Sequence, residues 1–99
     1  MIRAICAVKE QQSKAVLVTI IATRGSTPRK AGTKMLIYPD GRIVGTIGGG
    51  CTESEARQQA LRALDENTSF TYLLSLLDDT AAAEGMVCGG TMEIFLQVI

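Results

Sequence analysis

The chain has 99 residues, of which 46% are hydrophobic and only 4% are aromatic, so the sequence predicts one small domain with an aliphatic core. Its formal net charge is zero, which argues against a general nucleic-acid binder, because phosphate contacts require an excess of basic residues. No apolar run approaches the roughly 18 residues of a membrane span, the N-terminus lacks the apolar region of a signal peptide, and an odd count of three cysteines argues against a disulfide framework.

The first half of the chain is expected to contain one helix and three strands. Apolar residues within 2–12 recur at helical spacing. Residues 14–23 are β-branched and apolar on both faces, which is typical of an internal strand that is buried on both sides. Residues 24–33 form a loop, and Pro39-Asp40-Gly41-Arg42 has the composition of a hairpin turn. The expected strands of this half are residues 14–23, 34–38 and 43–47.

The second half is expected to contain the clearest helix, residues 52–65, with a capping box from Thr52 and Glu55 at its start. Residues 70–76 and 91–99 are expected to be strands, and the alternation in the last of them predicts one wetter face. Because strands and helices mix without a regular βαβ alternation, the expected fold class is α/β or α+β, a single domain with a mixed β-sheet and few packed helices. The helix carries an apolar stripe of mostly small residues, Ala56, Ala60, Ala63 and Leu64.

Three consecutive glycines, Gly48, Gly49 and Gly50, precede Cys51 at the start of this predicted helix. Glycines allow positive φ angles and leave the backbone N–H groups open to an anion. A thiol at a helix N-terminus lies in the positive end of the dipole, which lowers its pKa and favours the reactive thiolate. The segment therefore suits an anionic ligand beside a sulfur nucleophile. It equally suits a tight turn from strand to helix with Cys51 as a small buried residue.

Other candidate residues lie around this segment. The loop from 24 to 34 is basic, and within it Arg29 is suited to a bidentate phosphate contact, Lys30 to a point charge and Ser26 to a hydroxyl donor. Glu53 follows Cys51 by two positions and suits a general acid or base, or simply stabilises the helix N-terminus. The remaining candidates are cysteines: Cys88 precedes Gly89-Gly90 in a similar element, and Cys6 is expected in the core.

Several separated motifs together resemble the N-terminal domain of the XdhC/CoxI family of accessory proteins for xanthine dehydrogenase. They are Gly25-Ser26-Thr27-Pro28-Arg29, Gly32, Met35, Asp40-Gly41, Gly45 to Cys51 with Glu53, and Cys88-Gly89-Gly90. The resemblance implies binding of molybdenum cofactor, support of its sulfuration and help with its delivery to an apo-hydroxylase. It implies a cofactor site at Ser26, Arg29, Lys30, Gly48–Gly50, Cys51 and Cys88, with Cys51 as a soft metal ligand or sulfur carrier.

The resemblance also implies partners, first of all a molybdenum hydroxylase such as xanthine dehydrogenase. Many family members carry a second, Rossmann-like domain, whereas residues 1–99 form only the first. The contribution of that domain is expected to come from a separate Rossmann-domain protein, or to be dispensed with, and a cysteine desulfurase is a further candidate partner. The expected location is the cytoplasm, where thiols stay reduced. The C-terminal strand could pair edge to edge into a homodimer.

Other function classes stay open from the residues alone. A sulfurtransferase could use Cys51 as its nucleophile, although the chain contains no histidine to activate the thiol. A zinc site at Cys51 and Cys88 falls short of the usual four ligands. A docking module for a hydroxylase or for a Rossmann-domain partner would need no ligand. A cofactor chaperone is favoured over a catalyst.

Overall fold

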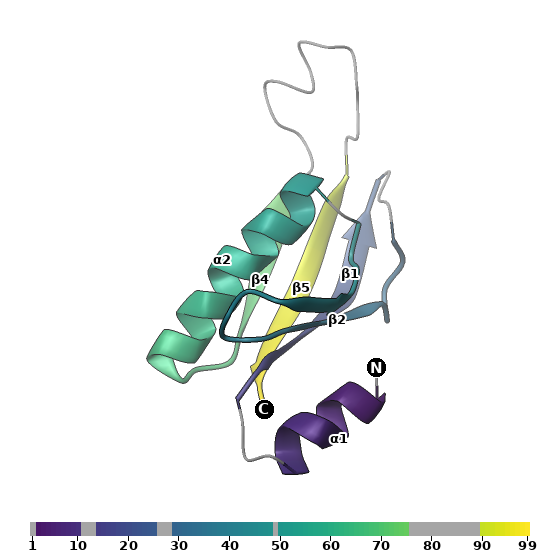
Figure 1. Ribbon diagram of the computed structural model, residues 1–99. Helices are drawn as coiled ribbons and strands as arrows, with labels where there is room; N and C mark the ends of the chain where they lie inside the picture. The colour runs from purple at the N-terminus through teal and green to yellow at the C-terminus, as the bar shows by residue number, and fades with distance from the viewer. Residues whose placement is uncertain (1, 11–13, 26–28, 49, 76–89) are drawn as a thin grey trace.

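The structure, a computed structural model, describes residues 2–10, 14–25, 29–48, 50–75 and 90–99 (Figure 1). Each predicted helix and strand is present with small shifts at its ends. No helix among the described residues is long and apolar enough to cross a membrane. The elements in chain order are α1 (Ile2–Glu10), β1 (Val16–Arg24), β2 (Lys34–Ile37), β3 (Ile43–Gly45), α2 (Gly50–Glu66), β4 (Phe70–Ser75) and β5 (Thr91–Val98).

The strands form one five-stranded sheet in the order β3-β2-β1-β5-β4. The predicted class, a single domain of mixed helix and strand, is confirmed. All four neighbouring pairs are antiparallel, however, so the sheet itself is not mixed. The physical reason is the path of the chain. Parallel neighbours need a crossover between them, and here the helical crossover, α2, runs from the edge strand β3 to the opposite edge strand β4.

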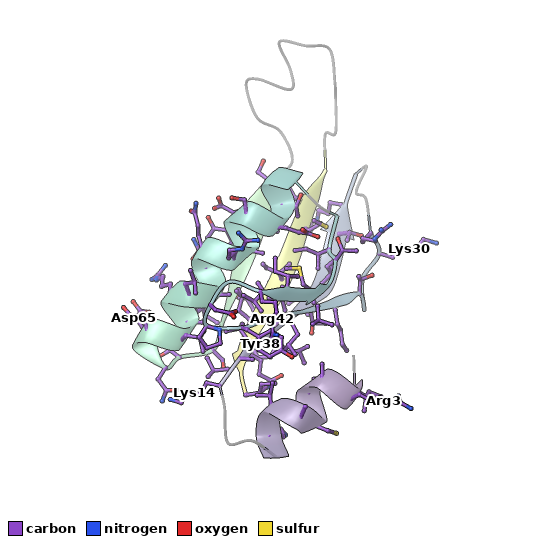
Figure 2. The ribbon with its side chains drawn as sticks, in the orientation of Figure 1. Arg3, Lys14, Lys30, Tyr38, Arg42 and Asp65 are labelled. Carbon is purple, nitrogen blue, oxygen red and sulfur yellow. The ribbon has the colours of Figure 1, made fainter. Side chains whose placement is uncertain are left out.

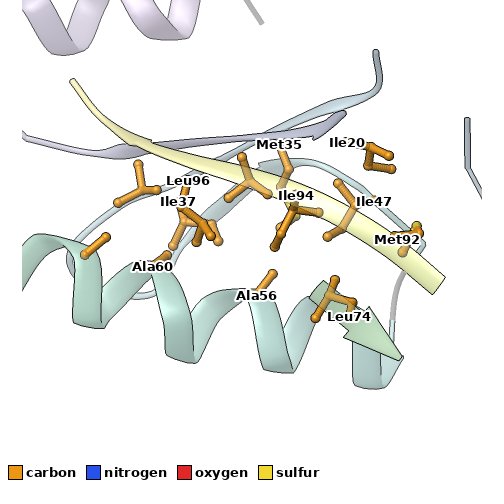
Figure 3. Close-up of a cluster of buried hydrophobic side chains, with 13 residues drawn as sticks. Ile20, Met35, Ile37, Ile47, Ala56, Ala60, Leu74, Met92, Ile94 and Leu96 are labelled. Carbon is orange, nitrogen blue, oxygen red and sulfur yellow. The ribbon is translucent and has the colours of Figure 1, made fainter. Parts of the chain in front are cut away.

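The main core lies between the sheet and α2 (Figure 3). The predicted small-residue stripe faces the sheet, with Ala56, Ala60 and Ala63 fully buried, so the helix backbone approaches the strands closely. Along β5 the side chains alternate as expected, with Ile94 and Leu96 buried on the α2 side. Burial of such aliphatic side chains contributes about 1.5–3 kcal/mol each. The strand side of this core comprises Val16, Val18, Ile20, Met35, Ile37, Leu74, Met92, Ile94 and Leu96.

The short helix α1 covers only part of the other face of the sheet. Its Val8 packs with Ala15 and Leu36, and Leu17 is half-buried beside them. The interior position predicted for residues 14–23 is confirmed. Only the first half of β1 is buried on both sides. Beyond it α1 no longer covers the sheet, so Ile21 is 45% exposed.

The cysteine of α1 does not lie in the core. Cys6 is exposed, which corrects the expectation that it is buried. The reason is the helical periodicity, because Ala4 and Val8 lie four residues apart on the face that packs on the sheet and Cys6 falls between them on the outer side.

The predicted hairpin turn joins β2 to β3. The Asp40 Oδ1 atom accepts a hydrogen bond from the Arg42 N–H group at 2.9 Å, and Gly41 has a φ of 89°, which favours glycine. The Arg42 guanidinium lies over the Tyr38 ring, 4.3 Å from its centroid (Figure 2). The turn therefore has the side-chain chemistry that its sequence predicts.

The C-terminal strand lies inside the sheet. β5 pairs with β1 on one side and with β4 on the other, so it offers no free edge for the edge-to-edge dimer expected from the sequence. The outer strands are β3 and β4, and the chain ends beside α1 at the opposite end of the molecule from the start of α2 (Figure 1).

Candidate functional site

The turn into α2 carries the glycine-cysteine segment that the sequence singles out. Helix α2 begins at Gly50, so residue 51 lies in its first turn. Gly48 precedes the helix with a φ of 143°, a conformation that side-chain-bearing residues rarely adopt. The helix starts two residues earlier than predicted. Thr52 is therefore inside the first turn, and the capping box from Thr52 and Glu55 is not formed.

A hydroxyl group links this turn to the helix. The Thr46 hydroxyl donates a short hydrogen bond to the Glu53 Oε1 atom and accepts one from the Gly48 N–H group at 3.1 Å. Glu53 is half-buried. Its carboxylate thus joins the segment after β3 to the first turns of α2. Thr46 was not among the candidate residues predicted from the sequence, and it lies seven residues before its partner.

A second carboxylate of α2 is also held by a side chain. The Tyr72 hydroxyl of β4 donates a hydrogen bond to the Glu55 Oε1 atom at 2.6 Å. Glu53 and Glu55 are thus each bonded to a hydroxyl group from outside α2. This bond raises the pKa of Tyr72 above its ordinary value of 10.0, with burial and the negative charge of Glu55 as smaller causes acting in the same direction.

The Tyr72 bond predicts a dependence of stability on pH. Because the folded-state pKa is raised, the contribution of the bond is complete below pH 10.0 and is lost as the pH rises through the folded pKa. We expect Tyr72→Phe to reduce the loss of unfolding free energy that the protein undergoes above about pH 10. Urea unfolding of both proteins from about pH 8 to pH 11 measures this difference. Parallel curves for the two proteins would contradict the prediction.

The Thr46 bond predicts a loss of stability on Thr46→Val. Valine keeps the shape but leaves the half-buried Glu53 carboxylate and the Gly48 N–H group without this partner, which costs about 1–3 kcal/mol. The matched control is Thr68→Val, because the Thr68 hydroxyl donates only to an exposed Glu66 carbonyl oxygen. We expect the control to change the unfolding free energy by about 0.5 kcal/mol or less. Equal effects of the two variants would remove the anchoring role of Thr46.

The basic loop follows β1. Its second half is held to the strand by two backbone hydrogen bonds, from Gly32 N to Ile20 O at 2.7 Å and from Ile20 N to Thr33 O at 2.9 Å. Arg29 and Lys30 are both exposed, and Lys30 projects away from α2 (Figure 2). The loop thus presents cations to solvent on a backbone that is fixed to the sheet.

Parts of the predicted site lie outside the described residues, namely Ser26, Gly49 and Cys88. Gly90, the last residue of the second glycine element, is buried just before β5. The start of α2, the end of β1 and the start of β5 lie at the same end of the molecule (Figure 1). Within the ranges that the structure describes, no three cysteine, aspartate or glutamate side chains gather as metal ligands would.

A shallow hollow of about 500 Å³, not predicted from the sequence, lies at this end of the sheet. Ala22, Glu93 and Leu73 lie directly opposite one another across β1, β5 and β4. Glu93 and Leu73 each lie between residues of the main core, so they and the paired Ala22 lie on the sheet face opposite α2. Arg24 and Thr91 form the next row toward the end of the sheet and also line the hollow. The only sequence signal for it was the wetter face predicted for the last strand.

The sequence profile of the XdhC and CoxI family matches residues 8–76, which include the basic loop, the glycine turn and α2. The chain belongs to the XdhC and CoxI family.

Relatives in the XdhC and CoxI family extend beyond the matched region. The chain is 36% identical over 95 residues to a probable xanthine dehydrogenase subunit of Bacillus subtilis strain 168, covering 94% of this chain and 29% of that protein. It is 39% identical over 90 residues to the protein YqeB of Escherichia coli strain K12, covering 91% of this chain and 16% of YqeB. A shorter match, 42% identical over 50 residues, covers 50% of this chain and 16% of the E. coli K12 molybdenum cofactor insertion chaperone PaoD.

The fold is also found in a solved structure. A crystal structure described as a xanthine dehydrogenase from Bacillus halodurans superposes with a TM-score of 0.77 at 27% identity, over 98% of this chain and 30% of that one. The chain thus spans less than a third of the length of each of these proteins.

Proposed function

We propose that this domain binds molybdenum cofactor and assists its insertion into a hydroxylase of the xanthine dehydrogenase type. The observation that carries the proposal is the start of α2. A helix of 17 residues begins at Gly50 and directs the positive end of its dipole at the position of Cys51. The nearby carboxylates of Glu53 and Glu55 each accept a hydrogen bond from a hydroxyl of another element, Thr46 and Tyr72.

The residues present fit the chemistry of this cofactor, which combines a phosphate, a pterin and a metal bound through sulfur. The exposed Arg29 and Lys30 suit the phosphate. The backbone N–H groups at Gly48 and Gly50 suit an anion, and Cys51 suits a soft metal or a sulfur atom. The proposed site also includes Ser26, Gly49 and Cys88 from outside the described residues. When bound, the group supplies the metal on which the hydroxylase depends, whereas the domain holds and orients it.

The proposed partner is a molybdenum hydroxylase, which would receive the cofactor. The names of two relatives support this proposed partner. PaoD is named a molybdenum cofactor insertion chaperone, and the B. subtilis relative is named a probable xanthine dehydrogenase subunit. Because the match covers less than a third of each relative, we propose that regions of the kind found in the relatives outside the match contribute to the complete activity.

Cys51 would also suit sulfur loading from a cysteine desulfurase. In this step the Cys51 thiolate attacks the outer sulfur of a persulfide on the donor, the sulfur–sulfur bond of the donor breaks, and the donor leaves as a thiolate. The exchange needs no external oxidant or reductant. Mass spectrometry after incubation with a desulfurase and cysteine tests it, with one added sulfur atom expected on the Cys51 peptide.

The binding proposal predicts a defined effect of Arg29→Ala. Anaerobic titration of the protein with molybdenum cofactor should yield saturable binding, and Arg29→Ala should weaken it by about 1.5–3 kcal/mol, the scale of a hydrogen bond to a charged group. Arg3→Ala is the matched control, because Arg3 is exposed on α1 (Figure 2).

The outcomes of this titration separate the function classes. Unchanged affinity on Arg29→Ala would remove the basic loop from the site. Failure of the unaltered protein to bind the cofactor would contradict the proposed function. Complex formation with a hydroxylase in the absence of any cofactor would then favour a docking module.

A further inference from the structure

Glu93 is an unusual residue for its position. It lies on β5, an interior strand, and its direct neighbours across the sheet are Ala22 on β1 and Leu73 on β4. Glutamate is disfavoured in strands, and these neighbours offer its carboxylate no hydrogen-bond donor. Glu93 is half-buried, and among the described residues its side chain makes no hydrogen bond or ion pair. Among the described residues, Glu93 thus places a carboxylate between two apolar side chains.

The surroundings of Glu93 have the character of a ligand site. The hollow has a volume of about 500 Å³, within the range of roughly 300–1,000 Å³ that small-molecule sites occupy. Ala22 and Leu73 give it an apolar floor, and the Leu73 side chain is 62% exposed, which leaves this surface open to a flat partner. Arg24, in the next row toward the end of the sheet, adds a cation.

We propose that this hollow binds the pterin ring of the cofactor, with the Glu93 carboxylate as its recognition group. A pterin presents its 2-amino group and its N3–H group side by side, and a carboxylate accepts both hydrogen bonds through its two oxygens. Ala22 and Leu73 pack against the ring, and Arg24 attracts the anionic part of the ligand. This inference rests on the proposed function and adds the residues that recognise the ring.

The hollow adjoins the basic loop of the proposed site. Gly25 lines the hollow and leads directly into the basic loop that carries Arg29 and Lys30. A ligand with its ring on Glu93 can therefore extend its phosphate toward that loop. The start of α2 lies at the same end of the molecule, although α2 covers the other face of the sheet (Figure 1).

The test compares two fluorescent probes that differ at the recognised edge. Pterin-6-carboxylate carries the 2-amino group, whereas lumazine-6-carboxylate carries an oxygen in its place, which would repel the carboxylate. We expect the protein to prefer the pterin probe by at least about tenfold. Glu93→Gln should weaken pterin binding about tenfold or more and remove most of this preference. Glu66→Gln is the matched control, because Glu66 is exposed at the far end of α2.

The outcomes distinguish this inference from the proposed function. If the protein binds molybdenum cofactor but Glu93→Gln leaves both the affinity and the probe preference unchanged, the hollow is not the pterin site and the proposed function stands. If the protein binds no cofactor at all, the proposed function itself fails. Unfolding in urea confirms that Glu93→Gln is folded, and Leu73→Asp, which places a second carboxylate beside Glu93, provides an independent variant that should also abolish pterin binding.

Discussion

Leu96→Ala should lower the unfolding free energy by about 2–5 kcal/mol. Leu96 is fully buried on β5, between Val18 and Phe70 of the neighbouring strands, and its side chain faces α2 (Figure 3). The substitution leaves a cavity at the centre of the main core, and the neighbouring strands cannot close around it because both are fixed in the sheet. Since a domain of this size is stable by only about 5–15 kcal/mol, this is a large fraction of the total.

The matched control for this prediction is Leu73→Ala, the same change at a leucine that is 62% exposed on the edge strand β4. We expect the control to change stability by about 0.5 kcal/mol or less. Thermal unfolding should show the contrast as a fall in Tm of at least about 8 °C for Leu96→Ala. A loss below about 1 kcal/mol at Leu96 would mean that β5 and α2 do not pack as described.

Local patterns were sufficient to predict the elements of this fold. The alternation along 91–99 predicted which side of β5 is buried, and the alanines of 52–65 predicted how α2 meets the sheet. Local patterns did not predict the direction of each strand in the sheet or how much of the sheet α1 covers. Ile21 is as apolar as Ile20, yet only Ile20 is buried, because α2 covers its face whereas α1 ends before it reaches Ile21.

The candidate site was predictable to a similar extent. The glycine turn and Cys51 form a contiguous signal, and the structure places residues 50 and 51 at the helix start as expected. The contacts that support them join residues from different elements, such as Tyr72 of β4 with Glu55 of α2. From the sequence alone, Glu93 is only one of several polar residues on the wetter face predicted for residues 91–99. Its apolar neighbours become visible only once β1 and β4 are paired on either side of β5.

Cys51→Ser should abolish retention of molybdenum cofactor, or sulfur loading, while it changes the unfolding free energy by about 0.5 kcal/mol or less. A hydroxyl at the same position keeps the size of the side chain, but it is neither a soft ligand nor a thiolate at neutral pH. The carboxylates of Glu53 and Glu55, which could compete for the same N–H groups, each accept a hydrogen bond from a side-chain hydroxyl, Thr46 and Tyr72.

The matched control is Cys6→Ser, since Cys6 is exposed on α1, away from the start of α2. We expect Cys6→Ser to bind the cofactor as the unaltered protein does.

Because an exposed Cys6 will also react with iodoacetamide, the thiolate at Cys51 is best measured in the Cys6→Ser background by site-resolved mass spectrometry across pH. Retained alkylation at Cys51 below about pH 7 would indicate a lowered pKa. If Cys51→Ser instead keeps full cofactor binding and Cys51 is inert, the thiol has no part in the site. The turn from Gly48 to Gly50 then acts as a phosphate pocket made of backbone N–H groups, or the domain acts as a docking module.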